Sequence, residues 1–317
     1  MDSSDVNQKP FVLDKLVELS IIQSTESSNR IEGIYTSDTR IKDLVLKKVV
    51  PKNRDEEEIL GYQDVLRTIH ESFEYIDISS SIILQLHRDL YKFSQKSIGG
   101  RFKNTQNYIS ETKANGSNEI LFTPLSPYET PAAIDEICKN YNQAIDDNTI
   151  NPLILIPTFI HDFLCIHPFN DGNGRMSRLL TTLLLYKLGF FVGRYISLEE
   201  KIEKSKNIYY DVLEESGINW HENNENTEPF IKYILGIIIA AYRDFEDRVD
   251  IFSSKSSAYE KVQHAVKMKI GKFTKSDIME LCPSISSASI ENSLTKLVEE
   301  NILERHGKGR GTYYVKN

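Results

Sequence analysis

The residues best suited to chemistry lie in one short stretch, residues 167–178, which reads His-Pro-Phe-Asn-Asp-Gly-Asn-Gly-Arg-Met-Ser-Arg. Its two glycines and asparagines permit a tight turn with exposed backbone amides. An apolar run that predicts a helix follows directly. Amides and the helix dipole at a helix N-terminus together favour an anion, above all phosphate. The stretch therefore predicts a phosphate-binding turn.

The side chains around this turn suit a polyphosphate. Arg175 and Arg178 are three residues apart, so they share one helix face, and guanidinium groups fit phosphate oxygens. Asp171 offers a hard carboxylate oxygen of the kind that Mg²⁺ takes when it bridges phosphates. His167 has an intrinsic pKa suited to a general base near neutral pH. The sequence contains neither the Walker pattern nor the Rossmann glycine fingerprint, so the phosphate site is of another kind.

The chain that must position this turn is predicted to be mainly helical. The spacing of apolar residues predicts helices at residues 11–28, 41–48, 56–75, 79–93, 131–145, 152–165, 175–188, 199–216 and 228–248. Two β-prone runs, 107–109 and 120–122, flank a polar loop with an Asn-Gly turn and predict a hairpin.

The pattern changes after a serine-rich linker at residues 253–257. Predicted helices follow at 258–269, 274–281 and 286–300, and predicted strands at 302–305 and 312–315. This order predicts a small winged helix-turn-helix (α+β) domain. Its last residues include the basic Arg305, Lys308, Arg310 and Lys316. Such a wing suits phosphate-backbone contacts, but the acidic chain favours target recognition or a structural role over DNA contact.

The composition bounds the class of protein. The 317 residues have a formal net charge of -8, which argues against a chain-wide nucleic-acid surface. Cys138, Cys165 and Cys282 are scattered, and we expect buried, reduced thiols rather than disulfides or a zinc site. No apolar run is long enough for a signal peptide or a membrane span, so a cytoplasmic protein without membrane contact is expected.

Residues 167–178 resemble the signature of the Fic family, HxFx(D/E)GNGRxxR, without a departure. The resemblance implies a mainly α fold, a Fic helical core with a β-hairpin flap, and transfer of AMP from Mg-ATP to a Tyr, Thr or Ser hydroxyl of a target protein. It implies that His167 deprotonates the hydroxyl and that Asp171 holds Mg²⁺. It also implies phosphate binding by Gly172, Asn173, Gly174, Arg175 and Arg178.

Two further segments resemble parts of that family. The flap, about residues 100–122, would pair with the backbone of the target through Thr105, Gln106, Asn107, Tyr108 and Ile109. Tyr209 and Tyr210 resemble the segment that lines the adenine pocket, although paired tyrosines on a helix are as often part of a core.

Residues 28–33 resemble the inhibitory pattern (S/T)xxxE(G/N) of the N-terminally inhibited class. We call them the inhibitory segment. Its Ser28 and Gly33 fit the pattern, and Glu32 is expected to pair with Arg178 in place of the γ-phosphate. ATP would then bind with its phosphates misplaced for attack. Glu32→Gly is expected to raise transfer.

These inferences divide the chain into an N-terminal helical region with the inhibitory segment (1–98), a catalytic core (99–252) and the winged-helix domain (253–317). The expected function is protein adenylyltransferase, acting also on itself, and a homodimer is plausible for the family. One alternative is removal of AMP, with Glu32 as the base. The other is a nucleotide-sensing, DNA-binding regulator, against which the intact His167 argues. His87 and the stretch Trp220-His221-Glu222 are given no chemistry.

Overall fold

The computed structural model describes the backbone of residues 3–94, 98–112, 118–250, 256–269, 271–282 and 285–317. The chain begins with α1 (Ser3–Ile31), α2 (Asp38–Val45), α3 (Arg54–Ser72) and α4 (Ser80–Leu90). The hairpin β1 (Ile109–Thr112) and β2 (Asn118–Phe122) follows. The helices then resume as α5 (Thr130–Asp147), α6 (Pro152–Ile166), α7 (Asn173–Lys187), α8 (Leu198–Lys204), α9 (Lys206–Gly217) and α10 (Glu228–Asp250).

The C-terminal part has three further helices and a second hairpin. These are α11 (Ala258–Lys267), α12 (Lys275–Leu281), α13 (Ser287–Glu299), β3 (Leu303–His306) and β4 (Tyr313–Lys316). Strands β3 and β4 are antiparallel, and an isolated bridge joins Phe273 to Tyr314. The order of elements matches the prediction, while assignment to the winged-helix class stays a prediction.

The mainly helical fold predicted from the sequence is confirmed, with two corrections. The helix predicted at residues 199–216 is broken at Ser205, whose hydroxyl donates to the Lys201 carbonyl and bonds the Tyr233 hydroxyl. The first hairpin strand starts at Ile109 rather than Asn107, because the Asn107 amide bonds elsewhere. The Asn-Gly turn of this hairpin lies outside the described residues.

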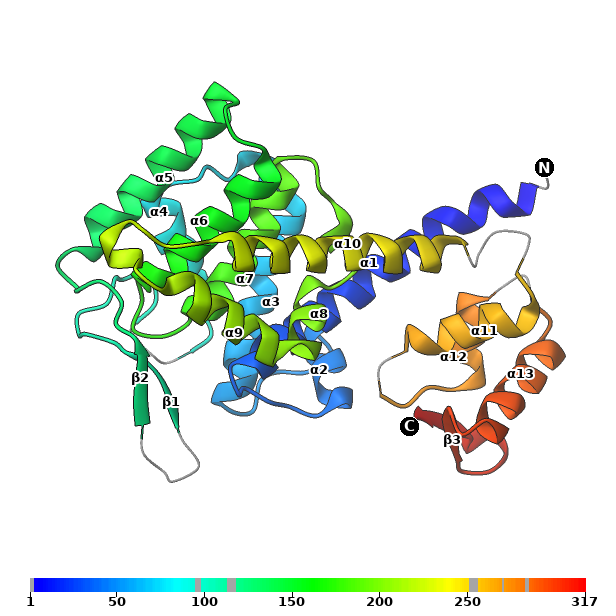
Figure 1. Ribbon diagram of the computed structural model, residues 1–317. Helices are drawn as coiled ribbons and strands as arrows, with labels where there is room; N and C mark the ends of the chain where they lie inside the picture. The colour runs from blue at the N-terminus through cyan, green and yellow to red at the C-terminus, as the bar shows by residue number, and fades with distance from the viewer. Residues whose placement is uncertain (1–2, 95–97, 113–117, 251–255, 270, 283–284) are drawn as a thin grey trace.

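Helix α7 lies in the middle of the main core (Figure 1). Its side chains are buried on all sides, from Arg175 through Tyr186. Helices α3 and α6 pack against it. A helix that is buried on every face is held rigidly, so the core fixes the residues that α7 carries at its first turn. Among the described helices, none is both long and apolar enough to cross a membrane.

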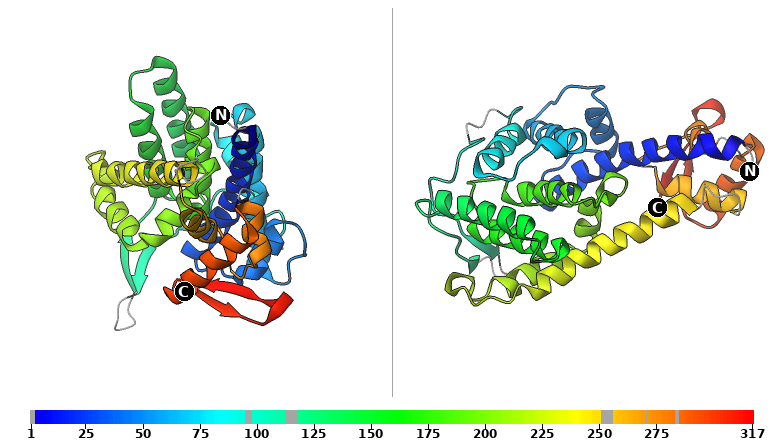
Figure 2. Two further views of the ribbon diagram at one scale, coloured as in Figure 1. Left: turned by 90° about the vertical axis from the view of Figure 1, so that its right-hand side faces the viewer. Right: turned by 90° about the horizontal axis from the view of Figure 1, so that it is seen from above.

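The C-terminal helices form a second hydrophobic core beside the first half of α1 (Figure 2). Leu16 and Leu19 of α1 are buried in this second core, with Val262 and Phe273. Farther along the same helix, Ile21, Ile22 and Ile31 belong to the main core. Helix α1 is therefore shared by both parts of the molecule.

Candidate active site

The predicted phosphate-binding turn joins the end of α6 to the start of α7. His167 ends α6 in the left-handed conformation, with φ 52°, and its N–H donates to the Phe163 carbonyl at 3.0 Å. Gly172 precedes α7 with φ 88°, a conformation that favours glycine, and no side chain caps the helix. The first amides of α7 are therefore left for an anion.

Asn173 shapes this turn from within. Its side-chain oxygen accepts from the Phe169 N–H at 2.9 Å, and its amide nitrogen donates to the Phe169 carbonyl at 2.7 Å. The residue is 3% exposed. With both polar atoms engaged, Asn173 holds the backbone of the turn in place, a role that the resemblance did not include.

His167 has the protonation state of a base. Its Nδ1 lies 3.2 Å from the Leu164 carbonyl, and since a carbonyl only accepts, Nδ1 carries the hydrogen and Nε2 the lone pair. Burial lowers the pKa of His167 from 6.5 to about 4, and the nearby charge of Lys103 acts in the same direction. The imidazole is therefore neutral at pH 7.

Arg175 lies deeper than the turn and is 1% exposed. Its Nη2 lies 2.9 Å from the Glu58 carboxylate, donates to the Tyr91 hydroxyl at 2.7 Å and lies 3.7 Å from Asp171. Its Nε and Nη1 are buried and have no hydrogen-bond partner in the described part of the chain. Nε and Nη1 of Arg175 can thus donate to a ligand, while Nη2 already contacts Glu58.

Arg178 binds the inhibitory segment, residues 28–33. Its Nη2 lies 2.7 Å from the Glu32 carboxylate and 2.9 Å from the Ser28 carbonyl, and its Nε donates to the Ser28 hydroxyl at 2.8 Å. Arg178 is 3% exposed. The structure therefore brings Ser28, Glu32 and Arg178 together at the first turn of α7.

The carboxylate of Glu32 also touches the helix N-terminus itself. A Cβ atom added to Gly174 would lie 2.2 Å from Glu32 Oε1. Gly33, with φ 77°, ends the helical run just after Glu32. The carboxylate thus occupies a position suited to an anion at the start of α7.

A buried network holds α1 in this place. The Glu199 carboxylate accepts from the Tyr62 hydroxyl at 2.9 Å and from the Ser24 hydroxyl at 2.7 Å. At the end of α1, Lys206 Nζ donates to the Ile31 carbonyl at 2.7 Å. These bonds satisfy polar groups that burial would otherwise penalise. These hydrogen bonds fix α1 to the main core.

The segment before the hairpin is tied to the turn. Asn107 donates to the Phe169 carbonyl at 3.0 Å, and Thr105 donates to the Asn170 side chain at 3.2 Å. Gln106 donates to the Pro124 carbonyl at 2.9 Å. Of the five predicted docking residues, only Ile109 lies in a strand, while Tyr108 is 55% exposed. Thr105, Gln106 and Asn107 therefore position the loop, while pairing of the flap with a target backbone stays a prediction.

His87 joins the segment before the hairpin to the phosphate-binding turn, a role that its position in the sequence does not indicate. Its Nδ1 accepts from the Gly100 N–H at 3.1 Å, so its Nε2 carries the hydrogen and donates to the Asp171 carbonyl at 3.0 Å. Its ring stacks on Phe169 with centroids 3.6 Å apart. Burial lowers the pKa of His87 to about 4, which keeps this tautomer neutral. Its partners are far apart in the chain, so no local spacing could have indicated them.

Trp220 and His221, in the short helix η3 (Trp220–Glu222), fasten β2 to α6. The Trp220 indole donates to the Asp162 carboxylate at 2.9 Å, and His221 Nε2 lies 2.9 Å from the Thr123 carbonyl. The His221 ring stacks on Phe122 at 5.4 Å. Burial raises the pKa of Asp162 to about 6. Trp220 and His221, to which the sequence assigned no chemistry, thus hold the flap in place. We call this pair the clamp on the flap.

The two tyrosines of α9 differ. Tyr209 is 4% exposed, whereas Tyr210 is 44% exposed. Burial raises the pKa of both hydroxyls, and Arg178 and Glu32 are among the charges that act on them. Both tyrosines therefore lie near the Arg178–Glu32 pair, with Tyr209 in the core and Tyr210 at the surface.

Residues 77–185 match the model of the Fic/DOC family. The matched residues include the turn between α6 and α7. It is 27% identical over 184 residues to protein adenylyltransferase fic-1 of Caenorhabditis elegans, covering 57% of this chain and 32% of that one. It is 22% identical over 262 residues to protein adenylyltransferase Fic of Nematostella vectensis, covering 78% and 52%. The chain thus spans about half or less of the length of these relatives.

Solved structures share the fold. A Fic domain containing signaling protein from Bacteroides thetaiotaomicron has a TM-score of 0.65 at 24% identity, covering 80% of this chain and 94% of that one. A Fic family protein from Desulfovibrio desulfuricans has a TM-score of 0.58 at 17% identity, covering 100% and 97%. At these identities the likeness establishes the fold alone.

Proposed function

We propose that the chain is a protein adenylyltransferase, which moves AMP from ATP to a hydroxyl side chain of a target protein. The observation that carries the proposal is the neutral His167, with a free Nε2, beside an uncapped helix N-terminus and Arg178. The names of the relatives from C. elegans and N. vectensis agree with this activity.

The chain's own groups suit a triphosphate. The α7 amides and the unpaired nitrogens of Arg175 are donors for phosphate oxygens, and Arg178 becomes one when Glu32 leaves. Asp171 fits a magnesium ion because its carboxylate is 41% exposed and belongs to the phosphate-binding turn. The described residues hold no cluster of three metal-ligating side chains, so Asp171 would share Mg²⁺ with phosphate oxygens and waters. That ion would neutralise phosphate charge.

The transfer would proceed by in-line displacement. The hydroxyl oxygen of the target forms a bond to the α-phosphorus of ATP while the bond to the β-phosphate oxygen breaks and pyrophosphate leaves. His167 Nε2 takes the hydroxyl proton. The target backbone would add as a strand to β1, which among the described strands pairs with β2 alone. The acceptor is Tyr, Thr or Ser, including hydroxyls of the chain itself.

The inhibitory segment restrains this activity. Glu32 holds the Arg178 nitrogen that the γ-phosphate would take, so ATP binds with its α-phosphorus turned away from the attacking hydroxyl. Removal of Glu32 leaves Arg178 Nη2 without its carboxylate partner, while Ser28 still bonds Arg178.

The test is labelling with Mg²⁺ and α-labelled ATP, with cell extract as a source of targets. Glu32→Gly should label protein strongly, the native chain weakly, and Glu32→Gly with His167→Ala not at all. No label with any of the three would overturn the proposal. Release of AMP from a modified protein that depends on Glu32 would instead indicate the reverse reaction.

A further inference from the structure

Helix α1 connects the C-terminal domain to Glu32. Leu16 and Leu19, near its middle, are buried in one core with C-terminal residues such as Val262. Its end, at Ile31, is buried in the main core directly before Glu32. Figures 1 and 2 show α1 running without a break from one part of the molecule to the other. Anything that fixes the C-terminal domain on α1 therefore acts on the helix that directly precedes Glu32.

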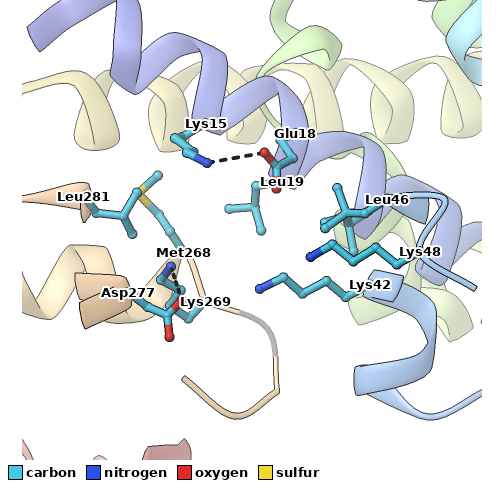
Figure 3. A pocket seen from close by; sticks show the side chains of 11 residues that line it. Lys15, Glu18, Leu19, Lys42, Leu46, Lys48, Met268, Lys269, Asp277 and Leu281 are labelled. Carbon is cyan, nitrogen blue, oxygen red and sulfur yellow. Dashed lines mark hydrogen bonds and ion pairs between the residues drawn. The ribbon is translucent and has the colours of Figure 1, made fainter. Parts of the chain in front are cut away.

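A cavity of about 240 Å³ lies where α1, α2 and the C-terminal domain meet. Leu19, Met268 and Leu281 supply much of its apolar wall. Figure 3 shows the ammonium ends of Lys42 and Lys48 pointing into the space between α2 and the C-terminal domain. The cavity thus combines an apolar wall with cations that project inward.

The charges of the cavity are unbalanced. Among the side chains that the structure describes, lysines 15, 42, 48 and 269 line it, together with two carboxylates, Glu18 and Asp277. Glu18 pairs with Lys15 at 3.5 Å. Asp277 accepts from the N–H and the hydroxyl of Thr274 at 2.7 and 2.8 Å and lies 3.7 Å from Lys269.

Lys42, in α2, and Lys48, three residues after its end, differ from the other two lysines. Within the described chain, neither Lys42 nor Lys48 has a carboxylate within 4.0 Å. Like charges converging on one hollow beside an apolar wall create a positive potential that attracts anions. Two converging ammonium groups suit the oxygens of a single phosphate or carboxylate group.

We propose that this cavity is a binding site for a small anion bearing phosphate or carboxylate groups, held by Lys42 and Lys48. The volume of about 240 Å³ is below that of pockets for drug-sized ligands, so the ligand is of the size of inorganic phosphate or a tricarboxylate. The anion would bridge α2 to the C-terminal domain across the middle of α1.

The bound anion would strengthen inhibition, a consequence that rests on the proposed function. A ligand shifts a protein toward the conformation whose site it fits. The cavity is formed while Glu32 is paired with Arg178. Occupancy therefore favours the state in which α1 is docked and Arg178 is withheld from ATP.

Binding is tested on the full chain by calorimetry with inorganic phosphate and with citrate, at constant ionic strength. Lys42→Gln with Lys48→Gln should weaken binding about tenfold, the loss expected for two partly exposed ion pairs. Lys47→Gln with Lys52→Gln is the matched control, because these lysines lie in the same segment but do not line the cavity. Equal affinity in both variants, or a response no larger than that to chloride, would overturn the site.

The regulatory consequence is tested by AMP transfer at fixed free Mg²⁺. The anion that binds should lower transfer by the native chain, but not by Lys42→Gln with Lys48→Gln or by Glu32→Gly. Binding without any effect on native transfer would overturn the coupling. Absence of transfer in Glu32→Gly would count against the proposed function alone, since the binding result does not depend on activity.

Discussion

The carboxylate of Glu32 lies 2.7 Å from Nη2 of Arg178, although 146 positions separate the two residues in the chain. The pair joins the residue after α1 to the N-terminal part of α7. Glu32 directly follows a helix that is buried in two cores, and Arg178 is 3% exposed. The contact is thus held by the fold from both sides.

The close approach of Glu32 to Gly174 predicts a coupling between the two positions. An alanine Cβ at residue 174 would lie 2.2 Å from Glu32 Oε1, while the next atom outside Glu32, Arg178 Nη1, is at 3.2 Å. Gly174→Ala should therefore displace the Glu32 carboxylate and lower the free energy of unfolding by about 1 kcal/mol. In a Glu32→Gly background the same substitution should be nearly neutral. Chemical denaturation of the four chains measures the coupling, and additive effects would contradict the contact.

Ser28 predicts a graded release of inhibition. Ser28→Ala leaves the buried Arg178 Nε without its 2.8 Å partner, which costs about 1–2 kcal/mol in the docked state. AMP transfer should rise about tenfold above the native rate, yet stay below that of Glu32→Gly. Ser27→Ala is the matched control, since Ser27 is also buried but does not bond Arg178. Equal rates for the two alanine variants would exclude a role of Ser28 in holding Arg178.

The sequence predicted the parts of the site that local spacing determines. The turn and the helix after it follow from the residues of one short stretch. The pairing of Glu32 with Arg178, which are 146 positions apart, is expected only from the resemblance of residues 28–33 to the inhibitory pattern. The partners of Arg175 and His87 follow from neither the stretch nor the resemblance, because Glu58, Tyr91 and Gly100 reach them only through helix packing. Periodicity likewise could not reveal the break at Ser205, where a tertiary bond to Tyr233 accompanies the end of the helix.

The protonation of His167 predicts an unusual pH dependence of transfer. Burial lowers its pKa from 6.5 to about 4, and Glu32 is a group that raises it. Because the neutral imidazole is the active form, kcat/KM of Glu32→Gly for ATP should stay level from pH 8 down to about 5 and fall only as the pH approaches 4. An unperturbed histidine would lose half its activity at about pH 6.5. Circular dichroism at each pH distinguishes this fall in kcat/KM from unfolding. A fall in kcat/KM centred near pH 6.5 in a folded chain would contradict the lowered pKa of His167.

The clamp on the flap predicts a defect in target binding alone. His221→Ala removes the stack on Phe122 and the bond to the Thr123 carbonyl, so β2 loses its hold while the phosphate seat is untouched. In a Glu32→Gly background, transfer to extract proteins should fall about fivefold, because losing one exposed hydrogen bond and one ring stack costs about 1 kcal/mol. Binding of a fluorescent ATP analogue should be unchanged, and hydrogen exchange at residues 118–122 should accelerate. His306→Ala, in the distant β3, is the control and should alter none of these. Loss of ATP binding in His221→Ala would show instead that the clamp supports the nucleotide site itself.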